Sequence, residues 1–434
     1  MRGYCAMPDL GRAPHEKMLV VNVMPHGPAY EFAPGERPDV SWDRPDGSWV
    51  GFWEREWPDL LGAAVLRATD RYAWEVWQPD LRADRCYSAT LPTGVVHRLF
   101  PATTRTYRPG IRVTSGLYSA SLLAEITDLR DRPAVLQLHG FRVPFYEEVL
   151  GSLGRRRRCH VVVMSHGVAR TPLGELFGVH RPLTYLCLAV ELWKLRRMLR
   201  KVDVMSEYTT AALADFRRVY GGRIERITMG CDFDFWTPVP SADVRQRVRD
   251  ELGIGAARTV FFASGNYVPR KQLDRLVDSF RTLERRDDWF LVLAGHGDRA
   301  NTERLAAAAA PLVEAGKALM HPYVEGAALR NLYWAADVYV SVATDEGGPV
   351  SVMKAMACGL PVVTTPVGIT WELMAARGVG IVVPAGDYAA WTRAFTRILE
   401  RGAPPALDLA VARRTFDWAV IAGRVAAIYA ELLP

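Results

Sequence analysis

Two series of short apolar runs, each separated by stretches of helical periodicity, constrain the fold of this chain more than any other feature. Strands that alternate with helices imply parallel strands with helices on both faces of a sheet. The first series predicts strands at Met18–Met24, Trp74–Trp77, Ala134–His139, His160–Met164, Val202–Met205 and Ile224–Met229. Helical periodicity runs from about Pro58 to Thr69, from Tyr118 to Leu129 and from Thr209 to Val219.

The second series begins after a break at Thr237–Asp243, whose prolines interrupt the pattern. It predicts strands at Thr259–Ala263, Trp289–Ala294, Leu319–Tyr323, Asp337–Val342, Pro361–Thr365 and Gly380–Val383. A chain of 434 residues is long enough for two such cores. We therefore expect two doubly wound α/β units. The expected parts are an N-terminal extension (1–17), a first domain (18–243), a second domain (244–415) and a closing helix (416–434).

The segment from Asp337 to Val363 carries the clearest candidate site. An apolar strand leads into a polar turn, and a helix over Val350–Cys358 follows, ending at Gly359. Pro349 fits the first helical position, where its missing N–H costs nothing. Gly347 and Gly348 would let a ligand approach the backbone, and the free amides of a helix start favour an anion. Glu346 would accept hydrogen bonds from hydroxyl groups. The alternative is a tight turn with a solvated glutamate.

These residues resemble the signature of the family 4 glycosyltransferases. The matching positions are Glu346, the run from Ala355 to Val363 (AMACGLPVV), Gly368 and Glu372. The second glutamate of the family pattern is missing, and Lys354 stands in its place.

The resemblance implies the GT-B fold, in which two Rossmann-like domains face a cleft and the last helix crosses back to the N-terminal domain. It also implies a retaining transfer of sugar from a nucleotide-diphosphate sugar to an acceptor hydroxyl, with neither cofactor nor metal ion. His139 and Glu346 would be catalytic. The alternatives are a catalytically impaired sugar-nucleotide-binding protein and a GT-B phosphorylase or epimerase.

A second segment, Ala263 to Gln272, resembles the part of the family that holds the donor diphosphate. Gly265 and Lys271 match, whereas Asn266 replaces an arginine and Gln272 replaces a glycine. A diphosphate leaving group gains negative charge as the glycosidic bond breaks, so a cation is needed. Lys271 would supply it, with Arg270 as substitute for the missing arginine. The alternative is a solvated Arg–Lys pair.

The resemblance also implies roles for the remaining donor-binding residues. Gly295 lies in a glycine turn after a strand, and Tyr323 with Val324 lies where the backbone would read the base. Gly47 belongs to a loosely matched phosphate loop. Gly347, Gly348, Pro349 and Val350 would face the sugar and its phosphate.

Two histidines end neighbouring strands of the first series. His139 and His166 each precede a glycine, and ligands bind outside the carboxyl ends of α/β strands. The resemblance places His139 near the acceptor and the transferred sugar, and His166 is a weaker pocket candidate. The alternative for each is a buried histidine bonded to backbone.

Lys354 lies about one turn inside its helix, and a helical side chain leans toward the N-terminus. We expect its ammonium to reach the helix start beside Glu346. There it would touch a phosphate, pair with a carboxylate, or donate to the ribose hydroxyls.

Composition limits the partners and the setting. A net charge of +6 suits anionic substrates and is too small for a nucleic-acid-binding signature. Six scattered cysteines without a CxxC predict reduced thiols, no zinc site and a cytoplasmic location. No apolar run is long enough to span a membrane. The segment Leu183–Lys201 is apolar and then basic, so peripheral membrane contact is one interpretation. A core-packed helix with a solvated basic end is the one we favour.

Overall fold

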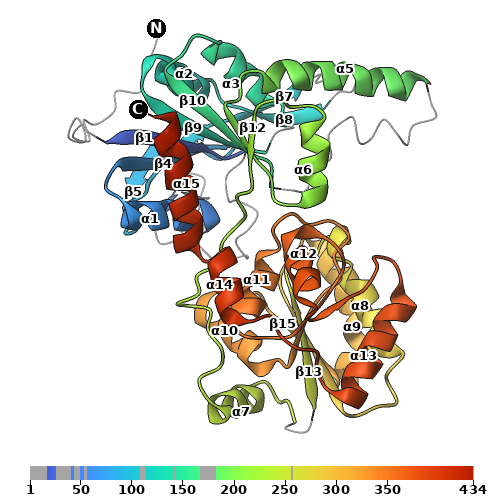
Figure 1. Cartoon of the computed structure of the whole chain (residues 1–434). Coiled ribbons are helices and arrows are strands. Elements are labelled where there is room, and N and C mark those ends of the chain that lie inside the picture. The colour runs from blue at the N-terminus through green and yellow to red at the C-terminus, as the bar shows by residue number, and fades with distance from the viewer. Residues whose placement is uncertain are drawn as a thin grey trace. The chain divides into compact units, whose positions relative to one another are not determined.

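The computed structural model describes residues 17–25, 41–43, 49–52, 56–107, 114–140, 143–166, 182–255 and 258–433. The chain divides into two compact units (Figure 1). The first contains residues 1–228 together with 418–434, and the second contains residues 229–417. Both are α/β units with parallel sheets, as the alternating pattern predicts.

The first unit is built, within the described residues, on an eight-stranded sheet in the order β12-β11-β10-β9-β1-β4-β6-β5. Every neighbouring pair is parallel except β5 and β6. Two antiparallel hairpins, β2–β3 and β7–β8, stand apart from it. The strands are β1 (Met18–Val23), β2 (Ser41–Asp43), β3 (Trp49–Gly51), β4 (Tyr72–Asp80), β5 (Tyr87–Thr90), β6 (Val96–Pro101), β7 (Thr103–Tyr107), β8 (Thr114–Tyr118), β9 (Ala134–His139), β10 (Cys159–Met164), β11 (Val204–Ser206) and β12 (Arg223–Glu225).

Helices cover both faces of this sheet. They are α1 (Trp57–Ala68), α2 (Ala120–Asp128), the 3₁₀ turn η1 (Leu129–Asp131), α3 (Phe145–Leu153), α5 (Pro182–Leu199), α6 (Thr210–Arg217) and α15 (Trp418–Leu432). One core packs α2, α3, α5 and α6 against the sheet, and the other packs α1 and α15. The last helix therefore returns to the first unit, as the GT-B resemblance implies. The Tyr72 hydroxyl donates to the carbonyl of Ala426 in this helix at 3.0 Å.

The strands β5 to β8 are absent from the sequence-based expectation. Three of them, β5, β7 and β8, have few fully buried side chains, so they lack the continuous apolar run that marks a central strand. β6 is more buried, but its run Val96–Pro101 contains His97 and Arg98. Pairing with neighbouring strands, and not a continuous apolar sequence, keeps these segments in the β conformation.

The second unit is built on a six-stranded, fully parallel sheet within the described residues, in the order β15-β14-β13-β16-β17-β18. Its strands are β13 (Thr259–Ser264), β14 (Trp289–Ala294), β15 (Ala318–His321), β16 (Val338–Ser341), β17 (Val362–Thr364) and β18 (Ile381–Val382). Its helices are α7 (Ala242–Glu251), η2 (Pro269–Lys271), α8 (Leu273–Arg281), α9 (Arg299–Glu314), α10 (Gly326–Ala335), α11 (Val350–Ala357), α12 (Gly368–Arg377), α13 (Tyr388–Arg401) and α14 (Leu409–Phe416).

The units meet in sequence at Thr228 and at Asp417, not at residues 243 and 415. The first boundary lies earlier in the chain than predicted because the segment before α7 already packs on the second unit. The Trp334 indole donates to the carbonyl of Thr237 at 2.7 Å. Trp236 is buried against Tyr333, with ring centroids 5.5 Å apart. Prolines break the helical pattern here without ending the domain.

The carboxylate of Asp337 links the helix α7 to the rest of the second unit. Asp337 accepts from Arg245 at 2.8 Å and from Arg249 at 2.7 Å, and its second oxygen also accepts from the amide of Val260 at 2.8 Å. The Arg249 side chain is buried and also donates to the carbonyl of Ala335. Asp337 thus joins α7, β13 and β16.

Replacing Asp337 by asparagine should lower the free energy of unfolding of the second unit by about 2–3 kcal/mol, because a buried arginine loses its anion. Urea unfolding, followed by circular dichroism, measures this change. Asp250→Asn is the matched control on the same helix, where the exposed carboxylate accepts from Gln246 and, among the described residues, pairs with no cation. Equal midpoints for the two variants would contradict the assignment.

Candidate functional site

The predicted donor-binding residues that the structure describes follow the carboxyl ends of four adjacent strands. Gly265, Asn266, Arg270 and Lys271 follow β13, and Gly295 follows β14. Tyr323 with Val324 follows β15, and the segment 346–350 follows β16. Since these strands are neighbours in the order β15-β14-β13-β16, the residues lie along one edge of the sheet. This edge is where parallel α/β sheets bind ligands.

The helix α11 begins and ends much as its sequence predicts, with one difference. Pro349 is the N-cap residue and not the first helical residue. Its carbonyl accepts from the amides of Val352 and Met353 at 3.0 and 3.1 Å. The first amides, those of Val350 and Ser351, precede any acceptor within the helix and face outward from its start. At the other end Gly359 is left-handed, with φ of 73°, and closes the helix.

Glu346 is held by both predicted cations. Its carboxylate is only 9% exposed and lies 2.6 Å from the Lys271 ammonium. The same oxygen accepts from the Arg270 guanidinium, which also donates to the carbonyl of Asp345 at 3.0 Å. The amide of Thr344 donates to the carbonyl of Arg270 at 2.9 Å. The loops after β13 and β16 are therefore joined by two cations that share one anion, which excludes a freely solvated Arg–Lys pair.

Two glycines allow the loops after β13 and β14 to touch. A Cβ atom on Gly295 would lie 2.0 Å from the carbonyl oxygen of Gly265, so no larger residue fits there. The Gly265 amide donates to the carbonyl of Ala294 at 3.1 Å. Gly265 itself has φ of 142°, and the Lys271 ammonium lies close above it. This close contact by itself explains why position 295 is a glycine, whether or not a nucleotide binds there.

Gln272 occupies a position where the family pattern has glycine, and its backbone explains why. It has φ of 47° and ψ of 35°, the left-handed region that glycine adopts without steric cost. The residue joins η2 to α8 immediately after Lys271. The departure from glycine therefore costs local strain but leaves the turn intact.

Lys354 does not lie where the sequence predicts. Its ammonium sits 4.6 Å from the centroid of the Trp236 ring, a cation–π contact. No carboxylate of the described residues pairs with it, so the ion pair, one of the three predicted contacts, is not formed, and the contacts with a phosphate or with ribose hydroxyls stay predictions. The physical reason is the Trp236 ring, which attracts the ammonium in the last turn of α11, the end of a helix that favours a cation. Glu346 is neutralised by Arg270 and Lys271 instead.

The other donor-binding candidates make few contacts with one another within the described residues. Tyr323 donates to Glu325, and its ring lies 4.6 Å from that of His296. The Gly347 carbonyl accepts from the Ile369 amide at 3.0 Å, which ties the turn to α12. Asn266 and Val324 are partly exposed, and so is Gly348. Gly47 lies outside the described residues.

The two histidines of the first unit are joined by hydrogen bonds. His139 Nδ1 lies 3.1 Å from His166 Nε2, and His166 Nδ1 lies 2.9 Å from the Tyr208 hydroxyl. His139 Nε2 lies 3.1 Å from Asn22 Oδ1 and 3.0 Å from Gln137 Nε2. Both nitrogens of His139 are therefore engaged within the protein. This arrangement matches the alternative of a buried, hydrogen-bonded histidine, with side chains rather than backbone as partners, and its catalytic role stays a prediction.

Sequence reasoning missed the other members of this cluster. The Trp57 ring packs edge-on against both imidazoles, 4.5 Å from His139 and 4.9 Å from His166. Tyr429 of α15 donates to Gln137. A signal was present for Asn22 and Gln137, because each is a polar residue within an apolar strand. No pattern pointed to Trp57 or Tyr208, which come from other elements.

Burial keeps both histidines neutral. It lowers the pKa of His139 well below its usual value, helped by neighbouring His166, and it lowers the pKa of His166 from 6.5 to about 4.

A folded chain in which these histidines have a lower pKa binds fewer protons than the unfolded chain. Stability should therefore fall as the pH drops from 6.5 towards 4, by up to about 1.4 kcal/mol per pH unit and per histidine. In His166→Gln this slope should be shallower, as urea midpoints across that range would show. An unchanged slope would contradict the assignment.

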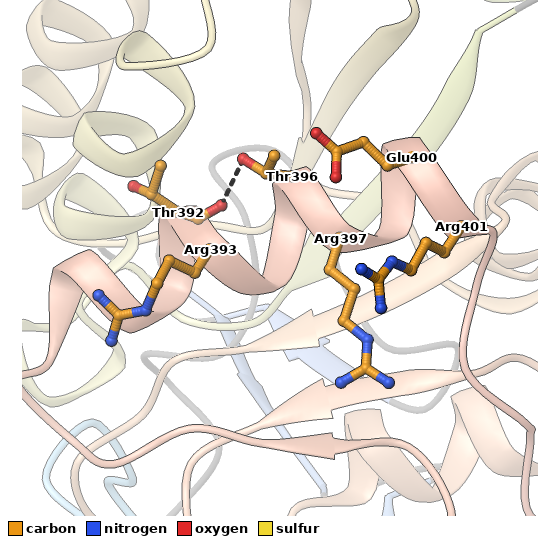
Figure 2. A pocket seen from close by; sticks show the side chains of 6 residues that line it. All are labelled: Thr392, Arg393, Thr396, Arg397, Glu400 and Arg401. Carbon is orange, nitrogen blue, oxygen red and sulfur yellow. Dashed lines mark hydrogen bonds between the residues drawn. The ribbon is translucent and has the colours of Figure 1, made fainter.

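One hollow in the second unit is not part of this site. It has a volume of about 290 Å³ and is lined by residues of α13 alone, among them Arg393, Arg397, Arg401 and Glu400 (Figure 2). Its side chains come from a single helix turned to the outside, and no strand end contributes to it. Among the described residues, no group of three His, Cys, Asp or Glu is arranged to hold a metal ion.

Two doubly wound parallel units, with the final helix returned to the first, define a GT-B glycosyltransferase fold. A sucrose-phosphate synthase from Thermosynechococcus elongatus matches it with a TM-score of 0.70 at 18% identity, over 96% of this chain and 99% of the other. Anabaena HepE in complex with UDP-glucose matches with a TM-score of 0.61 at 17% identity, over 95% of this chain and 100% of the other.

Residues 244–411 match the family model of the glycosyl transferases group 1. The resemblance seen in the sequence is therefore confirmed for this part of the chain. A D-inositol 3-phosphate glycosyltransferase from Xylanimonas cellulosilytica is 30% identical over 238 residues, which cover 53% of this chain and 57% of the relative. The chain spans about half the length of the curated relatives that it matches.

Proposed function

We propose that this chain transfers a glycosyl group from a nucleoside-diphosphate sugar to an acceptor hydroxyl. The observation that carries the proposal is the convergence of Lys271, Arg270 and Glu346 beside the open start of α11. Two cations and free helix amides suit a diphosphate, and a carboxylate suits sugar hydroxyls. The match of this unit to group 1 glycosyl transferases supports the same assignment.

In the proposed reaction the bond from the anomeric carbon to the diphosphate breaks, and a bond to the acceptor oxygen forms on the same face. The acceptor proton passes to the leaving diphosphate, so no carboxylate nucleophile, cofactor or metal ion is needed. Lys271 and Arg270 would stabilise the charge that grows on the diphosphate. The five cysteines of the described residues are free thiols, which supports a reducing, cytoplasmic setting.

A thermal-shift screen against UDP, GDP, ADP and dTDP sugars tests donor binding, because a ligand that binds only the folded chain raises its melting temperature. A donor so identified is then incubated with candidate acceptors, and the anomeric configuration of the product is read by NMR. No stabilisation by any of these compounds would contradict the proposal. Release of inorganic phosphate or epimerised donor would instead identify a phosphorylase or an epimerase.

The rival function is a non-catalytic sugar-nucleotide-binding protein, favoured by Lys354 in place of a family glutamate. Because Lys354 contacts Trp236 and not Glu346, we expect Lys354→Glu to keep turnover within about tenfold of the natural chain. The rate of glycosyl transfer is the measurement, with Lys354→Met as a neutral control. Transfer that appears only in Lys354→Glu would mean that the natural chain is a binder.

A further inference from the structure

The helix α5 of the first unit leaves one face uncovered. Leu192, Leu195 and Leu199 pack in the core of the unit, and Cys187 and Leu188 are buried on the same side, as the favoured interpretation of this segment predicts. On the opposite face, however, Leu186 is 54% exposed and Trp193 is 61% exposed. They are seven residues apart, which puts them on one side of the helix. Figure 1 shows α5 reaching outward from the sheet of its unit.

The same face turns basic toward the end of the helix. Arg196, Arg197 and Arg200 are exposed, and the Arg197 guanidinium lies 5.8 Å from the centre of the Trp193 ring. No described residue of this face is acidic, since Glu191 lies on the buried side. We call Leu186, Trp193 and these three arginines the α5 face. It joins an apolar end to a cationic end along a single helix.

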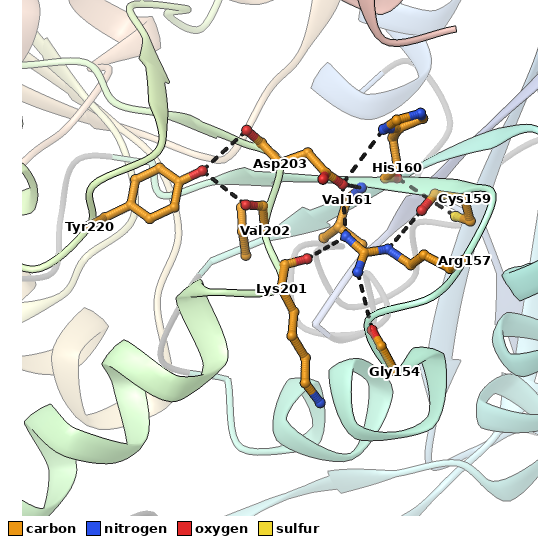
Figure 3. Close-up of polar contacts among 9 residues, drawn as sticks. All are labelled: Gly154, Arg157, Cys159, His160, Val161, Lys201, Val202, Asp203 and Tyr220. Carbon is orange, nitrogen blue, oxygen red and sulfur yellow. Dashed lines mark hydrogen bonds and ion pairs between the residues drawn. The ribbon is translucent and has the colours of Figure 1, made fainter.

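Positive charge continues from α5 onto the neighbouring loop. Lys201 follows the helix directly, and burial, then repulsion by Arg197, Arg157 and Arg155, lowers the pKa of its ammonium. The Arg157 side chain is itself buried and paired with Asp203 at 2.8 Å (Figure 3), so the exposed charge comes from Arg197 and Arg155. Repulsion of this kind is relieved when an anionic surface approaches.

A hollow of about 380 Å³ lies at the basic end of this face. Arg196 and Arg200 line it together with Gly221 and Gly222. Its size suits a phosphate-bearing head group between two guanidinium groups.

We propose that the α5 face docks the first unit on the surface of an anionic lipid bilayer. Leu186 and Trp193 would enter the boundary between head groups and acyl chains, while Arg196, Arg197 and Arg200 contact the phosphates. Within the described residues no helix is long and apolar enough to cross a membrane, and the proposed contact needs no spanning segment. The inference stands independently of the proposed glycosyl transfer.

Vesicle co-sedimentation of the full chain tests this proposal. With vesicles of phosphatidylcholine containing about 30% phosphatidylglycerol, the natural chain should bind, and binding should weaken as salt is added. Vesicles of phosphatidylcholine alone should bind it at least about tenfold more weakly. Equal binding to both compositions, or none to either, would overturn the proposal.

Two variants separate the contributions of the face. Arg196→Gln/Arg197→Gln/Arg200→Gln and Leu186→Ala/Trp193→Ala should each weaken vesicle binding by about tenfold or more. All five side chains are exposed, so thermal midpoints should stay close to that of the natural chain. Unchanged vesicle binding in both folded variants would refute the assignment to α5.

The matched control is the basic face of α13, which lies on the other unit. Arg393→Gln/Arg397→Gln/Arg401→Gln removes the same charge from a hollow that includes Glu400 and no exposed Trp or Leu. It should leave vesicle binding nearly unchanged, and an equal loss would mean that net charge alone drives binding.

A second copy of the chain is the other candidate partner for the α5 face, and sedimentation velocity tests for it. A dimer that Trp193→Ala dissociates, without vesicle binding by the natural chain, would also overturn the proposal.

Discussion

Replacing Lys271 by methionine should lower the rate of glycosyl transfer by about 10²–10³-fold. The side chain keeps its length but loses the ammonium, which lies close above Gly265 and 2.6 Å from Glu346. A diphosphate leaving group develops charge in the transition state, so the loss should appear mainly in kcat. Steady-state kinetics with the donor from the thermal-shift screen gives the measurement.

Arg275→Met is the control for Lys271→Met. Arg275 lies on the adjoining helix α8, and its only ion pair within the described residues, with Asp278, is long and exposed. Its replacement should leave the rate within about twofold of the natural chain, as for a surface position. A Lys271→Met variant that is as active as this control would exclude the lysine from the diphosphate site, whatever the fold.

Replacing Glu346 by glutamine should change binding and turnover in opposite directions. This carboxylate neutralises Lys271 and Arg270 in the structure, so an incoming diphosphate has to compete with it for the two cations. A neutral amide competes less for the two cations, and the nucleoside diphosphate should bind about tenfold more tightly. Turnover should nevertheless fall about 10²-fold, because a neutral amide oxygen accepts from the sugar hydroxyls more weakly than the charged carboxylate does. Isothermal titration and initial rates measure the two effects.

Glu303→Gln provides the comparison for the Glu346 variant. Glu303 pairs with Arg299 at 2.7 Å on the exposed surface of α9 and contacts neither Lys271 nor Arg270 by an ion pair within the described residues. Its replacement should alter neither nucleotide affinity nor turnover. Weaker nucleotide binding by Glu346→Gln than by this control would show that the carboxylate supports the diphosphate site and does not compete with it.

The sequence alone determined the class of fold and the position of the candidate site along the chain. Continuous apolar runs are imposed by strands that are buried on both faces, so β1, β9, β10, β13 and β14 were predictable. The left-handed residue after α11 was equally predictable, because only Gly359 suits that backbone. The residue types around Glu346 and Lys271 also identified these two segments as parts of the candidate site.

Only the tertiary structure decided which side chains meet. Glu346 and Lys271 are separated by 75 positions in the chain, and the pairing of β13 with β16 brings their loops together. Lys354 was predicted from helix geometry to face the site, whereas Trp236, from a distant segment, holds its ammonium elsewhere. His139 and His166 were predictable as neighbours at strand ends, but their burial depends on Trp57 and Tyr208. Such contacts between elements distant in sequence leave no periodic pattern, because packing selects them only once the sheets have formed.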